Sequence, residues 1–174
     1  MRKSLVIMFA LACICSAQAR MLSLSLAAEG ELKLQNKDTL TGVSGDRDIK
    51  VIVAKGASVY LKDAYINHTY GVCNSQHAGL SFLGDGYLFL VGNNVVNGFD
   101  YAEPGIYVPR GCTLRIEGEG KLSAASGKTR PDGDYGYGQA AGIGAGADRG
   151  GDDSKNRSCG NIEIRGGVIT AKGG

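Results

Sequence analysis

The chain contains no tryptophan, only three prolines and no marked excess of either charge. Its 19 lysines and arginines are nearly balanced by 17 acidic residues, which gives a formal net charge of +2. A nucleic-acid partner requires a concentrated basic surface, so this balance argues against one. The lack of tryptophan also weakens the case for a strong sugar-stacking platform, and leaves the eight tyrosines as the main aromatic residues.

Long apolar runs are missing from the chain beyond its first residues. No window there approaches the length needed to cross a bilayer, so we expect no transmembrane segment. Residues 1–19 combine a basic start, an apolar stretch from Leu5 to Ile14 and a small-residue cleavage site at 17–19. We therefore predict a secretory signal cleaved after Ala19, and a secreted or cell-surface protein. A lipoprotein signal that uses Cys13 is the alternative.

Cysteine is sparse, and two of the five cysteines lie within the predicted signal. The remaining Cys73, Cys112 and Cys159 allow one disulfide and one free thiol, or no disulfide at all. They show no C-x-x-C spacing, which argues against a clustered metal site. His68 and His77 flank Cys73, but nothing in this spacing enforces a catalytic thiol–imidazole pair. We interpret the three cysteines as structural thiols.

Helical periodicity is absent, and short alternating apolar runs take its place. The runs are separated by glycine-rich and asparagine-rich corners such as 84–86, 92–94 and 117–120. Repeated units of this kind bury their apolar side by stacking on one another, which predicts an all-β parallel β-solenoid over residues 20–174, a single domain with little or no helix. An antiparallel sandwich is the alternative. The pairs that we align between units, with spacings of 29, 26 and 48 residues, are Val59/Leu61, Leu88/Leu90, Leu114/Ile116 and Ile162/Ile164. We expect replacement of Ile116 or Ile164 by aspartate to be strongly destabilising.

Four segments resemble a known family: KDTLTG (37–42), GIYVPRGCTLRIEGEGKLSAASG (105–127), AGIGAG (141–146) and CGNIEIRGGVITAKGG (159–174). The family comprises bacterial secreted or surface repeat proteins with a right-handed parallel β-helix, similar in architecture to pectate lyases. The resemblance implies that handedness, and a carbohydrate-binding or adhesin-like role. It also implies that further coils follow a segment such as 159–174, so we expect a fragment or a truncated product. The exposed edge of its last coil would favour self-association.

Two polar stretches, 127–139 and 147–159, interrupt the strand pattern and hold the candidate ligand residues. Long loops that leave one side of a stacked scaffold commonly carry binding function, although a simple solvated loop is the alternative. Tyrosine rings stack on sugar faces, which favours Tyr135 and Tyr137. The candidate ligand-binding residues are Tyr135, Tyr137, Asp132, Asp134 and Asp152. Together with Asp148 and Asp153, the three aspartates also suit a loop Ca²⁺ ion, although the EF-hand spacing fails because its twelfth position is Ile143. We expect no other cofactor.

The sequence thus favours a non-catalytic secreted or cell-surface module that binds polysaccharide or a host glycan. An enzyme, either a polysaccharide lyase or a glycoside hydrolase, is the first alternative. Hydrolysis needs two carboxylates at a set separation, and no pair of acids here has a fixed spacing. The second alternative is a purely structural repeat segment of a larger surface protein.

Overall fold

The computed structural model describes residues 18–66, 77–99, 103–127, 140–147 and 158–173. These residues form strands, turns and bends, and none of them lies in a helix. No helix in this part of the chain is therefore long and apolar enough to cross a membrane. The strands are β1 (Met21–Ser23), β2 (Gly30–Leu34), β3 (Thr39–Val43), β4 (Ile49–Val53), β5 (Ser58–Ile66), β6 (Leu80–Phe82), β7 (Gly86–Val91), β8 (Asn93–Asn97), β9 (Ile106–Tyr107), β10 (Thr113–Gly118), β11 (Lys121–Ala125), β12 (Ile143–Gly144), β13 (Asn161–Ile164) and β14 (Val168–Lys172).

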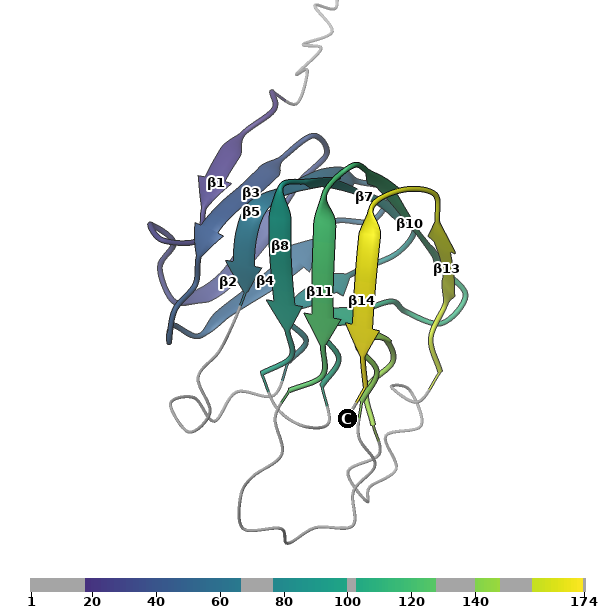
Figure 1. Ribbon diagram of the computed structural model, residues 1–174. Helices are drawn as coiled ribbons and strands as arrows, with labels where there is room; N and C mark the ends of the chain where they lie inside the picture. The colour runs from purple at the N-terminus through teal and green to yellow at the C-terminus, as the bar shows by residue number, and fades with distance from the viewer. Residues whose placement is uncertain (1–17, 67–76, 100–102, 128–139, 148–157, 174) are drawn as a thin grey trace, which may run out of the picture.

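The strands form two sheets, and every recorded strand pairing is parallel (Figure 1). The smaller sheet has the order β12-β9-β6-β4-β2, and the nine-stranded sheet contains all the other strands. Successive segments of chain place one strand in the smaller sheet and then one or two in the larger. We call these segments rungs, and number them one to five: β2–β3, β4–β5, β6–β8, β9–β11 and β12–β14. Each rung pairs with the next one along the chain.

Apolar ladders fill the space between the two sheets, because alternate residues of each strand point inward. One ladder joins Val59, Leu88, Ile116 and Ile164 through the parallel register of β5, β7, β10 and β13. The first three of these side chains are fully buried. The smaller sheet contributes a matching ladder that includes Val51, Leu80 and Ile106, all of them likewise buried.

The register corrects one of the alignments made from the sequence. Val59/Leu61 do lie opposite Leu88/Leu90, and Leu114/Ile116 do lie opposite Ile162/Ile164. Leu88, however, pairs with Ile116, not with Leu114, which lies opposite Gly86. A Cβ at Gly86 would lie 2.6 Å from the Phe82 ring, so this position has no room for a side chain. The apolar pattern of the sequence therefore does not show that residue 86 belongs to the alignment.

A buried asparagine organises the corner between β7 and β8. The side chain of Asn94 is 2% exposed, and its Oδ1 accepts a hydrogen bond from the backbone N–H of Ala64 in rung two (3.0 Å). Its Nδ2 donates to the carbonyl oxygens of Val91 in rung three and Lys121 in rung four, both at 3.1 Å. A single side chain thus ties three rungs together while leaving none of these buried polar groups unpaired.

The two ends of the stack differ. At the first end, residues 21–27 cover rung one, with Leu24 fully buried and Met21 and Leu26 exposed to solvent. At the last rung, Ile164 and Val168 are 55% and 60% exposed. The expectation that Ile164→Asp is strongly destabilising is therefore wrong, because this side chain is already largely in water. Ile116 is 0% exposed, so we still expect Ile116→Asp to be strongly destabilising.

Candidate functional site

The outer face of the nine-stranded sheet carries a strip of aromatic side chains. On β5 and β7, Tyr60, Tyr87 and Phe89 occupy the outward phase of the alternation, between fully buried inward neighbours. Tyr60 lies opposite Phe89 in the parallel register, and their rings stack with centroids 4.9 Å apart and planes inclined by 21°. Each ring covers one face of the other, and both remain partly exposed, so the pair forms an apolar surface on the outer side of the sheet.

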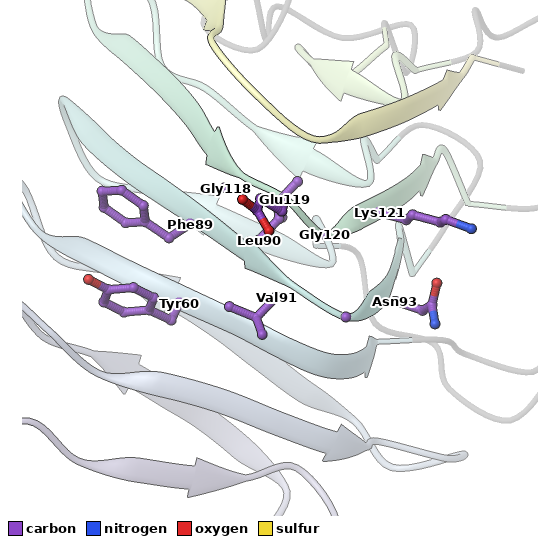
Figure 2. A pocket seen from close by; sticks show the side chains of 10 residues that line it. Tyr60, Phe89, Leu90, Val91, Asn93, Gly118, Glu119, Gly120 and Lys121 are labelled. Carbon is purple, nitrogen blue, oxygen red and sulfur yellow. The ribbon is translucent and has the colours of Figure 1, made fainter.

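A groove begins at this ring pair and runs along the corner between β7 and β8 (Figure 2). In Figure 2 the rings lie at one end, Asn93 and Lys121 lie at the other, and Val91 lies between them. The groove has a volume of about 620 Å³ and therefore has room for a small ligand. Its lining residues are Tyr60, Phe89, Leu90, Val91, Gly92, Asn93, Gly118, Glu119, Gly120 and Lys121.

Two glycines in rung four allow one wall of this groove to pack closely on rung three. A Cβ at Gly118 would lie 2.4 Å from the carbonyl oxygen of Leu90, and one at Gly120 would lie 2.7 Å from the backbone nitrogen of Val91. Gly118 also has a positive φ of 100°, which favours glycine. The EGEG turn therefore packs its backbone directly on rung three, and only Glu119 and Lys121 project beside the groove as charged groups.

A charged cluster borders the aromatic strip on the side of the last rung. The guanidinium carbon of Arg115 lies 5.3 Å from the Tyr87 ring centroid, and Nη1 donates to the Tyr87 hydroxyl (3.2 Å). Arg115 Nε also donates to Glu163 Oε2 (3.0 Å), as does Arg165 Nη2 (2.7 Å). The hydrogen bonds that Glu163 accepts from Arg115 and Arg165 lower the pKa of Glu163, and the bond that Arg115 donates to Glu163 raises the pKa of Arg115. Glu163 is thus a carboxylate at neutral pH, a poor general acid for glycoside cleavage.

The ligand residues expected from the sequence lie outside the described part of the chain. Tyr135, Tyr137, Asp132, Asp134 and Asp152 all fall in 128–139 or 148–157, as do the other candidate Ca²⁺ ligands Asp148 and Asp153. Elsewhere, within the ranges that the structure describes, no group of three or more His, Cys, Asp or Glu side chains could hold a metal ion. The expected tyrosine site and Ca²⁺ site therefore stay predictions.

The histidine and cysteine candidates are only partly described, because His68 and Cys73 lie outside the described ranges. His77 has both ring nitrogens engaged: Nε2 lies 2.8 Å from an Asp48 carboxylate oxygen, and Nδ1 lies 2.9 Å from the Ala78 carbonyl oxygen. Its ring packs on Phe99 with centroids 4.1 Å apart. His77 therefore links the segment before β6 to Asp48 and Phe99, which is a structural role.

Sequence reasoning missed the aromatic strip, although the signal for it is present. In SVYLK (58–62) and GYLFLV (86–91) the aromatic residues alternate with inward leucine and valine, so they occupy the phase that usually holds polar residues.

The chain matches no protein-family model, no curated protein and no solved structure. The groove geometry therefore carries the functional argument.

Proposed function

We propose that this chain is a secreted or cell-surface module, built as a right-handed parallel β-helix, that binds carbohydrate without cleaving it. The observation that supports the binding site best is the stacked Tyr60–Phe89 pair at one end of the groove. A sugar ring stacks on such a surface through its C–H face. Its hydroxyl groups then need polar partners, which Asn93, Glu119 and Lys121 supply along the groove.

The experiment that tests this proposal is a glycan array run beside a reducing-end assay on the same glycans. Binding without new reducing ends supports a non-catalytic module. New reducing ends would replace it with the enzyme, and no binding to any glycan would reject it.

Aromatic substitutions locate the site. Tyr60→Ala and Phe89→Ala each remove one face of the stacked pair, and we expect about tenfold weaker binding to the best glycan. Tyr65→Ala is the matched control, because Tyr65 also points outward from β5 but does not line the groove. If binding survives in the groove variants and is lost in Tyr135→Ala or Tyr137→Ala, the site lies in the segment expected from the sequence.

Export is the second part of the proposal. The backbone pairing nearest the predicted cleavage site uses Arg20, whose carbonyl accepts a hydrogen bond from Thr39 N (2.8 Å). A domain that starts immediately after Ala19 would thus keep this pairing. N-terminal sequencing of the exported protein should begin at Arg20, whereas a lipid-modified Cys13 would show the lipoprotein route.

The exposed apolar side chains of Ile164 and Val168 favour a second candidate, a repeat segment of a longer surface protein. In that case a further rung, or the last rung of a second copy, covers β13 and β14. DNA sequence beyond the Gly174 codon would reveal further rungs. Light scattering tests the second copy, and Val168→Lys should reduce the dimer if the last rungs associate.

A further inference from the structure

Two thiols lie at the same corner of neighbouring rungs. Cys112 ends the turn between β9 and β10 in rung four, where its N–H donates to the carbonyl oxygen of Pro109 (3.1 Å). Cys159 lies two residues before β13 in rung five. Both are free in this structure, with Cys112 half-buried and Cys159 exposed.

The backbone around these cysteines is in direct contact. β10 and β13 start in register, with Thr113 opposite Asn161, and Asn161 N donates to the carbonyl oxygen of Cys112 (2.8 Å). A Cβ on Gly160, the residue after Cys159, would lie only 2.2 Å from that same oxygen. In this register Cys112 lies opposite Gly160, and Cys159 is displaced from it by one residue. A strand spacing of about 4.8 Å and a rise of about 3.3 Å per residue then put the two cysteine Cα atoms roughly 6 Å apart, within the range of about 4.4–6.8 Å that a disulfide accepts.

The environments of the two side chains also correspond. A Cβ on Gly144 of β12 would lie 3.5 Å from the Cβ and 3.7 Å from the Sγ of Cys159. Gly144 pairs with Tyr107 of β9. Cys112 lies five residues after Tyr107, at the end of the turn that follows β9, so both thiols lie near the pairing of β9 with β12 that joins the two rungs.

We propose that Cys112 and Cys159 form a disulfide that clamps rung five to rung four. The exposed Cys159 thiolate attacks an oxidised disulfide carrier, such as a dithiol oxidoreductase or oxidised glutathione, and releases one carrier thiol. The Cys112 thiolate then displaces the second carrier sulfur, so the carrier gains two electrons and the protein loses two. Such carriers act on exported proteins, so formation of this disulfide rests on the proposed export. It does not depend on carbohydrate binding.

The bond would have two consequences. It would fasten rung five, where Ile164 and Val168 are exposed, to rung four, where Ile116 is fully buried. It would also enclose residues 112–159 in one covalent loop, which contains all five of the candidate ligand residues expected from the sequence. A closed loop of this length restricts the unfolded chain, which stabilises the folded one.

Peptide mapping tests the pairing directly. The purified protein is equilibrated with oxidised and reduced glutathione, alkylated, and digested with trypsin without reduction. We expect GCTLR (111–115) joined to SCGNIEIR (158–165), and two separate alkylated peptides after reduction. Separate peptides throughout the redox series, or a link from either one to the peptide that holds Cys73, would overturn the proposal.

Matched variants separate this bond from general oxidation. Cys73→Ser should keep the linked peptide, while Cys112→Ser and Cys159→Ser should both lose it. Reduction should lower the melting temperature of the wild type and of Cys73→Ser by about 5–10 °C, and leave that of Cys112→Ser unchanged. Equal redox dependence in all three proteins would overturn the clamp.

Discussion

The two ends of the rung stack are built from similar strands but meet water differently. At the first end, Arg47 donates four hydrogen bonds of 2.9–3.0 Å to the carbonyl oxygens of Ser25, Ala27, Val43 and Ser44. These bonds hold residues 25–27 over rung one, where Leu24 is fully buried. At the last rung, Ile164 and Val168 are exposed in the strands themselves, whereas the exposed apolar residues Met21 and Leu26 of the first end belong to the cover and leave Leu34 and Leu40 of rung one buried.

Alternation along a strand determines which way a side chain points, whereas its burial depends on whether a neighbouring rung covers it. Leu114 and Ile116 alternate with polar residues, as do Ile162 and Ile164, and the two strands pair residue for residue. Leu114 and Ile116 have a rung on each side and are 0% exposed, but Ile164 is 55% exposed. A stack of this kind is therefore least stable where a rung has only one neighbour.

The largest effect should come from a charge placed in this ladder. Ile116→Asp buries a carboxylate without a partner, and we expect it to lower the free energy of unfolding by about 4 kcal/mol or to prevent folding. Ile164→Asp, its neighbour in the register, should cost less than about 1 kcal/mol. Urea unfolding measures both, and equal losses would contradict the difference between an inner rung and the last one.

Removal of the corner asparagine should have the next largest effect. Asn94→Ala leaves the Ala64 N–H and the Val91 and Lys121 carbonyl groups without this partner, so we expect a loss of about 2–3 kcal/mol in urea unfolding. The control is Asn93→Ala, an exposed neighbour whose recorded hydrogen bond uses only its backbone N–H. A similar loss in the two variants would show that the side-chain amide of Asn94 does not hold the rungs together.

Loss of the hydrogen bonds that hold residues 25–27 over rung one should lower stability by a smaller amount and more locally. Arg47→Ala removes four hydrogen bonds from a charged donor, two of them to residues 25–27, and should cost about 2 kcal/mol. Hydrogen exchange should accelerate at the amide of Leu24, which donates to Thr41, before it does so in rungs three and four. Lys50→Ala, which loses only an exposed ion pair with Glu31, should leave both measurements unchanged.

The smallest effect concerns pH at the same end. Burial alone would raise the pKa of Asp38, but its hydrogen bonds from Arg20 and from the Gln35 N–H lower it overall. A lowered pKa means that this stabilisation is present above the ordinary aspartate value of about 4, and is lost as the pH falls through the folded value. Asp38→Asn should therefore cost about 1–2 kcal/mol at pH 7 and little at pH 2.

Melting temperatures of the wild type and Asp38→Asn between pH 7 and pH 2 measure this convergence. Glu31→Gln is the control, because hydrogen bonds from Lys33 and Lys50 lower the pKa of Glu31 as well, but that carboxylate is exposed. A gap between wild type and Asp38→Asn that persists at pH 2 would show that the carboxylate charge is not what stabilises this end.

Much of the strand pattern could be predicted from alternation and glycine corners. The segments around Leu61, Leu90, Ile116 and Leu122 are strands with these side chains inward, as expected. The candidate groove could not be predicted, because Tyr60 and Phe89 meet only through a pairing of distant residues. The tyrosines favoured by the sequence, Tyr135 and Tyr137, lie in a polar stretch, whereas the two aromatic residues of the groove, Tyr60 and Phe89, lie within strands.

The sequence by itself determined that the described chain is all-β and which residues of its strands point inward, because a strand alternates its side chains with period two. Only the tertiary structure decided that Leu88 pairs with Ile116, since the register depends on how many residues each corner takes. It also decided the exposure of Ile164 and the hollow beside Tyr60 and Phe89. Both depend on what the adjacent rung places there, and the contacts involved join residues too far apart for local patterns to specify.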